Sequence, residues 1–392
     1  MRIAISGAGV AGPTLAFWLH RIGHEPTIIE RAPRLRTGGY VIDFWGVGYR
    51  VAHRMGLEAD IRNAGYQVQT LRSVGPSGQI RASLSVDGFR RAAGGNLTSL
   101  ARGDLAAVVY SAISDDVETI FGDTITAIDQ HPKKVRVDFE HAEARDFDLV
   151  IGADGLHSTV RRLAFGPESG AEHYLGCFVA ACVVPGYRPR DESVYVTYSR
   201  PGRSVARFAL REDRTLFLFV FRADGDCDPG TLDTRKSLLR REFADQGWEC
   251  KHILAALDDL DDIYFDVVSQ VRLDHWSHGR VGLIGDAAGC VSLLAGEGTG
   301  LAMAAAYVLA GELQCAGGDH SRAFGAYERL MRPLVERKQA SAKRLIPVFA
   351  PKSELGIRLG QLVIRAMSFA PLGDRLITRT LRDDLELPDY PM

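Results

Sequence analysis

The sequence lacks the features that mark disulfide-bonded, zinc-binding and membrane-spanning chains. Its six cysteines form no C-x-x-C pair and show no zinc-ligand spacing, so we expect a reduced protein without a metal site. The longest apolar region, residues 281–313, is interrupted by Asp286, Glu297 and many glycines, so we expect no membrane span. The first residues already read as a strand, so we expect no signal peptide and a cytoplasmic location.

An excess of charge of one sign is also missing. The chain has 47 Lys and Arg residues against 49 Asp and Glu residues, and its basic residues are scattered. This balance gives no electrostatic reason for a nucleic-acid partner. Internal repeats and low-complexity tracts are missing too, so the 392 residues indicate one large globular domain or two smaller ones.

Against this background, the glycine-rich stretch GAGVAG at residues 7–12 stands out. A short apolar strand precedes it, and a helical pattern with Pro13 in its first turn follows it. In that context Gly7 allows a tight turn, Gly9 allows the backbone to approach a pyrophosphate, and Gly12 allows the helix to pack on the strand. The stretch therefore predicts a dinucleotide site, with a purely structural turn as the alternative.

The nature of the dinucleotide is indicated by the next strand. Residues 27–29 read as a strand that ends in Glu30, roughly 20 residues after the glycines, where an acid meets ribose hydroxyls. An acid disfavours a phosphorylated ribose, so this site predicts FAD or NAD rather than NADP.

Two later motifs place an acid at the end of a buried strand. In GADGLHSTVR, residues 152–161, Asp154 ends the strand, and Ser158 or Thr159 is positioned to cap the following helix. In GDAAG, residues 285–289, Asp286 ends the strand and is placed to accept a hydrogen bond from a ribityl hydroxyl. Each motif alone also fits an ordinary turn, but the three occur together and in order.

Together the three motifs resemble those of the group A flavoprotein monooxygenases, the family of para-hydroxybenzoate hydroxylase and the tetracycline-inactivating monooxygenases. The resemblance covers about residues 1–345 and includes the R-x-x-L start of a helix at Arg102. It implies cofactor contacts at Gly7, Gly9, Val10, Ala11, Gly12, Glu30, Arg31, Arg102, Asp154, Asp286, Gly296, Gly298 and Thr299.

The predicted fold class is α/β, with a Rossmann-like FAD-binding domain that carries a β-meander. Residues 173–272 read as a mainly antiparallel sheet with one helix, at residues 232–246. We assign residues 1–66, 97–172 and 273–345 to the FAD-binding domain, and residues 67–96 and 173–272 to an inserted substrate-binding sheet domain. Residues 346–392 form a C-terminal helical segment. We expect an amphipathic helix at residues 321–345 across both domains, with helix breaks at Pro347, Pro351 and Pro371.

The resemblance implies an oxidoreductase that uses tight, non-covalent FAD, NADPH or NADH as a transient reductant, and O₂ as a co-substrate. A flavin C4a-hydroperoxide would then hydroxylate a small or polycyclic aromatic or otherwise electron-rich substrate, in secondary metabolism or drug inactivation. The flavin supplies this chemistry, so no catalytic residue is assigned. The protein is expected to be a monomer or a homodimer.

Departures from the family pattern keep other functions open. Gly289 stands where hydroxylating members carry histidine, Ser292 and Leu293 stand where proline is usual, and Gly300 replaces an asparagine. The GDAAG motif and the following GEG triplet are also similar to those of geranylgeranyl reductases. The alternatives are therefore an FAD-dependent reductase of unsaturated lipid chains and a non-catalytic flavin-fold protein that binds a small ligand.

Four residues are candidates for the substrate pocket: Asp43, Trp45, Phe208 and Phe219. Asp43 and Trp45 lie in GGYVIDFWG, which matches the family segment that passes near the flavin ring. Phe219 belongs to an alternating aromatic strand that equally fits core packing against the helix after residue 231. Cys290, beside the predicted flavin loop, reads as a small buried residue rather than a redox group.

Overall fold

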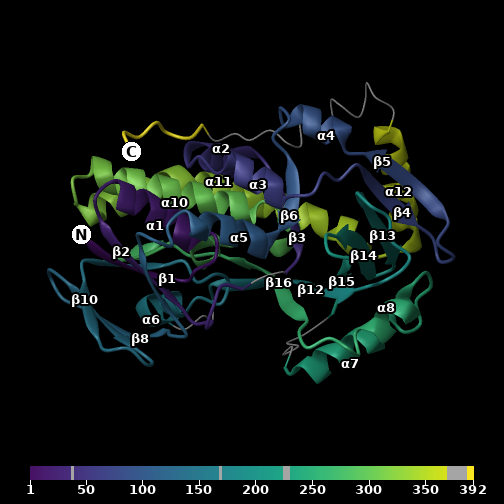
Figure 1. Ribbon diagram of the computed structural model, residues 1–392, viewed down its shortest axis with the longest axis horizontal. Helices are drawn as coiled ribbons and strands as arrows, with labels where there is room; N and C mark the ends of the chain where they lie inside the picture. The colour runs from purple at the N-terminus through teal and green to yellow at the C-terminus, as the bar shows by residue number, and fades with distance from the viewer. Residues whose placement is uncertain (37–38, 167–169, 224–229, 369–385) are drawn as a thin grey trace.

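The computed structural model describes residues 1–392 except 37–38, 167–169, 224–229 and 369–385 (Figure 1). One part of the fold is a six-stranded sheet in the order β17-β18-β11-β1-β2-β7. The strands are β1 (Arg2–Ser6), β2 (Glu25–Glu30), β7 (Glu118–Phe121), β11 (Leu149–Gly152), β17 (Ser277–His278) and β18 (Val281–Leu283). All pairs are parallel except β17 with β18. The continuous burial of residues 3–6 and 149–152 explains their unbroken apolar runs.

A three-stranded antiparallel sheet lies beside this parallel sheet. It has the order β10-β9-β8, from β8 (Ile125–Gln130), β9 (Val135–Phe139) and β10 (Arg145–Phe147). Val135, Val137 and Phe139 are buried and alternate with exposed residues, as the sequence predicted for a half-buried strand. This is the predicted β-meander.

The second large sheet has seven strands in the order β16-β12-β15-β14-β13-β4-β5. Its strands are β4 (Thr70–Val74), β5 (Ile80–Ser85), β12 (Glu172–Pro185), β13 (Val194–Arg200), β14 (Arg203–Leu210), β15 (Arg214–Phe221) and β16 (Tyr264–Val271). Only β13 and β4 pair in parallel. A two-stranded sheet, β3 (Val41–Phe44) with β6 (Thr98–Ala101), lies between the two large parts.

The helices cover the faces of these sheets (Figure 1). They are α1 (Ala11–Arg21), α2 (Gly46–Arg54), α3 (Glu58–Ala64), α4 (Asp87–Ala92), α5 (Arg102–Ser111), α6 (Thr159–Phe165), α7 (Leu232–Phe243), α8 (Cys250–Ala256), α9 (Asp286–Gly289), α10 (Gly298–Cys315), α11 (His320–Phe349) and α12 (Glu354–Met367), with a short helix η1 (Leu293–Ala295). The prediction of a single helix between the later strands was wrong, because α8 follows α7. Cys250, Ile253 and Leu254 give α8 a buried stripe that is too short to stand out in the sequence.

Helix α11 connects the cores of both large sheets. Its residues Met331 and Leu334 pack in the core of the parallel sheet, whereas Ile346 packs with Val179 and Val268 of the seven-stranded sheet. The predicted break at Pro347 was wrong, since α11 continues to Phe349. Pro347 costs little there because it lies in the last turn on an exposed face, where water can hydrate the carbonyl left without a backbone donor. Pro371 lies outside the described residues.

The C-terminal residues return to α10. Tyr390 donates a hydrogen bond to Glu312, with 2.6 Å between the two oxygens, and its ring occupies the space above Gly311. The carbonyl of Pro388 accepts a hydrogen bond from Tyr307 at 2.9 Å. Among the described helices, none combines the length and the apolar character needed to cross a membrane.

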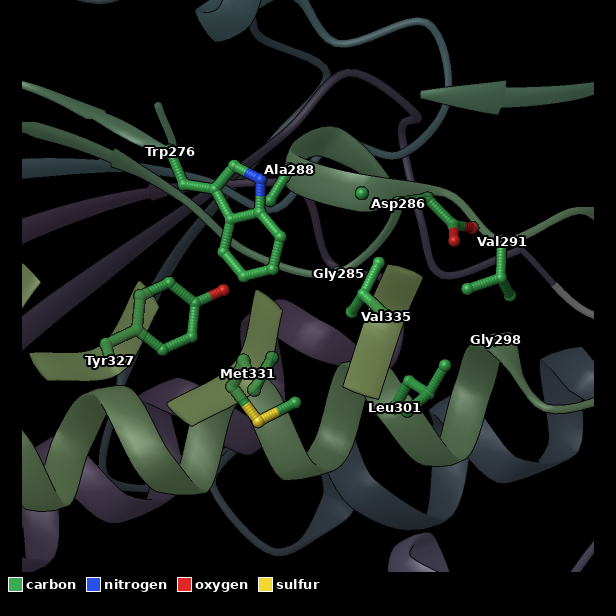
Figure 2. Close-up of a pocket in the computed structure, with 12 residues that line it drawn as sticks. Trp276, Gly285, Asp286, Ala288, Val291, Gly298, Leu301, Tyr327, Met331 and Val335 are labelled. Carbon is green, nitrogen blue, oxygen red and sulfur yellow. The ribbon is translucent and has the colours of Figure 1, made fainter. Parts of the chain in front are cut away.

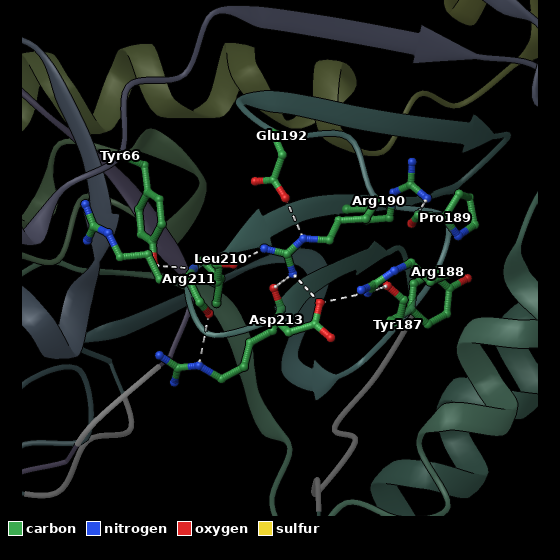
Figure 3. A network of polar contacts seen from close by, with 11 residues as sticks. Tyr66, Tyr187, Arg188, Pro189, Arg190, Glu192, Leu210, Arg211 and Asp213 are labelled. Carbon is green, nitrogen blue, oxygen red and sulfur yellow. Dashed lines mark hydrogen bonds and ion pairs between the residues drawn. The ribbon is translucent and has the colours of Figure 1, made fainter.

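A polar network joins the turn between β14 and β15 to the end of α3 (Figure 3). The Arg211 guanidinium donates to the carbonyl of Ala64 at 2.8 Å and lies 4.6 Å from the ring centroid of Tyr66. The Tyr66 hydroxyl accepts from the Arg211 backbone N–H at 3.1 Å. Asp213 of the same turn pairs with Arg190, which lies in the connection between β12 and β13 and also pairs with Glu192. These contacts hold one end of the seven-stranded sheet against the segment that precedes it.

Candidate active site

The glycine turn between β1 and α1 is packed too tightly for side chains. Gly7 has φ +107°, and a Cβ there would lie 2.6 Å from the carbonyl oxygen of Ala153. A Cβ at Gly12 would lie 2.0 Å from the carbonyl oxygen of Gly7. Both positions therefore require glycine, as the predicted nucleotide turn does. Val10 and Ala11, two further predicted contacts, are buried at the start of α1.

Glu30 lies directly beside this turn. One carboxylate oxygen accepts from the backbone N–H of Ala8 at 2.8 Å, and the other accepts from Ala32 at 2.9 Å. The acid predicted to meet ribose hydroxyls is therefore held at the end of β2, next to the N-terminus of α1. Arg31 follows it and is exposed.

Arg102 brings the first and third motifs together. It begins α5, and its Nη2 atom lies 3.8 Å from the position that a Cβ on Gly9 would take. Electrostatic interaction with Tyr40, followed by that with Asp286, raises the pKa of Arg102 above its ordinary value. A fixed guanidinium over a glycine turn at a helix N-terminus is an arrangement that suits a phosphate.

Asp286 faces the start of α10. A Cβ added to Gly298 would lie 3.6 Å from its Oδ1 atom, and Cys290 lies within hydrogen-bonding reach. Burial raises the pKa of Asp286, although the positive charge of Arg102 opposes the shift. Gly296 has φ +69°, and Thr299 lies in the first turn of α10. The predicted loop contacts thus lie around one carboxylate and one helix N-terminus.

A pocket lies between this carboxylate and helix α11 (Figure 2). Asp286, Gly298 and Leu301 lie on one side of it, and Trp276 and Tyr327 lie on the other. The pocket adjoins the predicted flavin loop. Because its walls are mostly apolar, the described residues that line it bring no charged group to this loop besides Asp286.

Asp154 has a more local set of partners. Its Oδ2 atom accepts from the backbone N–H groups of Thr159 at 2.8 Å and Val160 at 3.1 Å, at the start of α6. Ser158 is the N-cap residue of α6, as predicted. Burial raises the pKa of Asp154. The geometry fits the ordinary strand-to-helix turn, and the cofactor contact at Asp154 stays a prediction.

The four substrate-pocket candidates fall in three places. Asp43 and Trp45 line a second pocket together with Gly296 and Gly300 of the predicted flavin loop. Phe208 belongs to an aromatic cluster on the face of the seven-stranded sheet that β3 adjoins. Phe219 is 1% exposed on the opposite face, where its ring lies 5.1 Å from that of Phe243 in α7. The structure thus separates Phe219 from the others and gives it the core position that we kept as its alternative.

Two side chains of α11 belong to this region but were not among the predicted residues. Lys338 forms an ion pair with Glu297 at 2.8 Å, and its ammonium nitrogen lies 5.7 Å from the ring centroid of Trp45. The buried amide of Gln339 donates to the carbonyls of Val271 and Cys290. Lys338 and Gln339 reach the site through contacts between residues distant in sequence, and no local sequence motif reveals such contacts.

The departures from the family pattern have packing causes. A Cβ at Gly289 would lie 2.8 Å from Val335, so a histidine has no room there. Ser292 has φ +122°, which a proline ring cannot adopt. A Cβ at Gly300 would lie 3.3 Å from the backbone nitrogen of Gly48 in α2, so an asparagine there requires α2 to move slightly away.

The residues present therefore fit FAD. The turn at Gly9 with the Arg102 guanidinium suits the pyrophosphate, and Glu30 suits the adenosine ribose. Asp286 and the N-terminus of α10 suit the ribityl chain and the electron-rich edge of the flavin. These residue assignments remain predictions of contact.

Comparison with known proteins identifies the family. A family model described as an FAD binding domain matches residues 1–337. A flavin-dependent monooxygenase from an unknown prokaryotic organism is 34% identical over 345 residues, which cover 86% of this chain and 88% of that protein. This chain belongs to the group A flavoprotein monooxygenases.

Two further matches extend over almost the whole monooxygenase. An uncharacterised protein of Mycobacterium tuberculosis is 38% identical over 362 residues, covering 89% of the monooxygenase and 94% of that protein. The crystal structure of tetracycline destructase Tet(51) superposes with a TM-score of 0.84 at 31% identity and covers 99% of both chains. The FAD-binding fold predicted from the sequence is thereby confirmed, and the protein is an FAD-dependent enzyme.

Proposed function

We propose that this monooxygenase hydroxylates an electron-rich aromatic compound, small or polycyclic, with NADPH or NADH as reductant and O₂ as co-substrate. The oxygen-transfer route that the family resemblance implies is part of this proposal. Tetracycline destructase, whose name states a polycyclic target for that protein, supports the choice of substrate class.

One observation carries the proposal: the pocket that joins Asp43 and Trp45 to the loop at Gly296 and Gly300. This pocket lies between the predicted cofactor loop and β3, which in turn packs toward the aromatic cluster at Phe208. A flat aromatic substrate held there would have protein rings on one side and the cofactor loop on the other. Such placement supplies the proximity and the exclusion of water that oxygen transfer requires.

The chain's own residues would bind and orient the reactants. When bound, FAD supplies the redox and oxygen chemistry. Arg102 and the N-terminus of α10 would hold the negative groups of the cofactor, while Trp45, Val47 and Leu301, which line the pocket, would exclude water from the substrate. No side chain is assigned a proton transfer.

The test is turnover with isotopically labelled oxygen. FAD-loaded enzyme, NADPH or NADH and a panel of phenols, indoles and tetracyclines would be incubated, and products analysed by mass spectrometry. The proposal expects substrate-dependent consumption of reductant and oxygen, with one labelled oxygen atom in the product. Reduction of an alkene without oxygen consumption would instead establish the reductase alternative. Ligand binding with reductant oxidation at background level would establish the non-catalytic alternative.

The cytoplasmic location, the division into an FAD-binding and a substrate-binding domain, and a monomeric or homodimeric state complete the proposal. Light scattering coupled to size-exclusion chromatography would test the last of these, and a larger assembly would contradict it.

A further inference from the structure

Asp43 lies on the face of β3 that looks toward the seven-stranded sheet. Side chains alternate along this strand: Ile42 and Phe44 are buried in the core of the parallel sheet, whereas Val41 packs against the cluster around Phe208. Asp43 is two residues beyond Val41 and shares its face. The carboxyl group of Asp43 thus follows apolar Val41 on the face of β3 that looks toward the seven-stranded sheet.

The carboxyl group opens into a recess within the protein. Asp43 is exposed, and it lines the pocket with Trp45 and Gly300. Surrounding protein nevertheless raises the pKa of Asp43 by desolvation, against the effect of its hydrogen bond with Ser99. Water and ligand can therefore reach a carboxyl group that protein encloses on most sides.

Aromatic rings lie on the sheet side of Asp43. The rings of Tyr195 and Phe208 are stacked with their centroids 5.3 Å apart, and Tyr66 meets Phe208 edge to face at 5.5 Å. Tyr195 packs in the same cluster as Val41, which shares the face of Asp43. Burial, and then the negative charge of Asp43, raises the pKa of Tyr195.

The described residues provide no cation for this carboxylate. The hydroxyl of Ser99, its cross-strand neighbour, donates to Asp43, but no ion pair joins Asp43 to a lysine, arginine or histidine in this part of the chain. Lys338, the lysine that lines the same pocket, is engaged by Glu297 at 2.8 Å. A neutral side chain would satisfy Ser99 equally well, whereas a carboxylate that lines a pocket also attracts a positively charged ligand.

We propose that Asp43 binds a protonated amine on the substrate, so that the substrate class is an aromatic compound with a cationic amine. The carboxylate would pair with the ammonium group, and the ring of Trp45, which lines the same pocket, would lie against the substrate, as aromatic surfaces do around cationic ligands. This inference rests on the proposed function, because it takes the pocket as the substrate pocket.

Three phenols of matched shape provide the test. Tyramine carries a cationic amine, para-propylphenol is its neutral counterpart, and para-hydroxyphenylpropionate carries an anion. Their binding to FAD-loaded enzyme would be measured from changes in flavin absorbance and fluorescence. We expect tyramine to bind at least about tenfold more tightly than either counterpart, as for a desolvated charge pair.

Asp43→Asn should abolish this preference while leaving para-propylphenol binding within about twofold. Asp43→Ser provides a second variant, and the same change at exposed Asp129, Asp129→Asn, is the matched control. The inference would be overturned if the wild-type enzyme did not bind tyramine, or bound it no more tightly than its counterparts. It would also be overturned if both Asp43 variants kept the preference for tyramine. Loss of FAD by the Asp43 variants with unchanged selectivity would overturn it too, since the carboxyl would then serve the cofactor. The binding measurement does not depend on turnover, so it can be interpreted even if the hydroxylation assay fails.

Discussion

At the scale of single residues, Arg102 connects two of the motifs in the candidate site. It begins α5, lies over the turn at Gly9 and interacts electrostatically with Asp286 on α9. One guanidinium therefore serves two motifs that are more than half the chain apart in sequence.

We expect Arg102→Met to weaken FAD binding by about tenfold or more, because a charge-assisted contact to phosphate is lost. The measurement is the FAD dissociation constant of the apoprotein, together with the flavin content after dialysis. Arg145→Met, which removes a half-buried arginine paired with Glu118, is the control and should retain FAD. Equal flavin affinity in the two variants would contradict the assigned role of Arg102.

Asp123 is a second single residue with a large structural effect. It is 3% exposed, and its carboxylate accepts hydrogen bonds from the backbone N–H groups of Thr124, Glu140, His141 and Ala142. Burial alone would raise the pKa of Asp123, but these four donors together hold it below its ordinary value. The carboxylate therefore fixes the loop before β8 against the loop after β9.

Asp123→Asn should lower the free energy of unfolding at neutral pH by about 1–3 kcal/mol, since several buried donors lose an ionised acceptor. A carboxyl group with a lowered folded pKa contributes stability above its unfolded pKa of about 3.9 and loses it as the pH falls through the folded pKa. The difference between wild type and variant should therefore shrink below about pH 4. Urea unfolding across the pH range measures this, with exposed Asp129→Asn as control. A difference that stayed constant with pH would refute the assignment.

At the scale of secondary-structure elements, the C-terminal residues depend on one glycine of α10. A Cβ at Gly311 would lie 2.2 Å from the ring of Tyr390, whereas a Cβ at Gly360 of α12 meets nothing within 4 Å. The same substitution should thus have opposite effects in the two helices.

Gly311→Ala should displace Tyr390 and lower the free energy of unfolding by about 1–3 kcal/mol through overpacking. Gly360→Ala should leave it unchanged or raise it by about 0.5–1 kcal/mol through helix propensity. Thermal unfolding and protease sensitivity of residues 386–392 would be compared. Similar behaviour of the two variants would show that the Tyr390 contact does not hold these residues.

The connection from α9 to α10 is the element in which this chain differs from its family pattern. Gly289→His should destabilise the protein by about 1–3 kcal/mol, because Val335 and Trp276 fill the space of the new side chain. Gly289→His combined with Val335→Ala should recover part of the loss, a coupling that a double-mutant cycle measures. Purely additive effects would contradict direct contact between the two positions.

At the scale of the whole molecule, Arg211 joins the turn after β14 to the end of α3. Arg211→Ala should speed hydrogen–deuterium exchange of residues 64–66 and lower the free energy of unfolding by about 1 kcal/mol. Arg214→Ala, at the first residue of β15, is the control: its side chain pairs with exposed Glu212 and donates to the carbonyl of Arg211 but, within the described residues, forms no hydrogen bond or ion pair with α3. Unaltered exchange in Arg211→Ala would mean that other contacts hold the sheet.

The sequence alone predicted the large architecture of the molecule. Unbroken apolar runs at residues 3–5 and 149–151 identified parallel strands, and alternation at residues 135–139 identified an antiparallel one. These signals are local, so they are readable from one chain. The continuation of α11 through Pro347 was missed because it depends on packing of Ile346 against the distant seven-stranded sheet.

The candidate site was predictable to the same degree. The glycine turn, Glu30 and Asp286 occur in motifs with fixed spacing, and the structure places Arg102 among them. In contrast, Lys338, Gln339 and Tyr195 reach this region only through tertiary packing. Phe219 illustrates the limit most clearly, since the period of a strand tells which residues share a face but not which face meets the ligand.

The packing around Gly289, Ser292 and Gly300 has a consequence for substitutions at these positions. Val335 and the backbone at Ser292 exclude two of the residues usual in the family, and the close approach of Gly48 disfavours the third. Exchanging any one of these residues for the family's usual one is therefore expected to destabilise the protein unless residues of α2 or α11 change with it. The loop is thus coupled to two helices that are distant in sequence, so a change in the loop is expected to require a matching change in one of those helices.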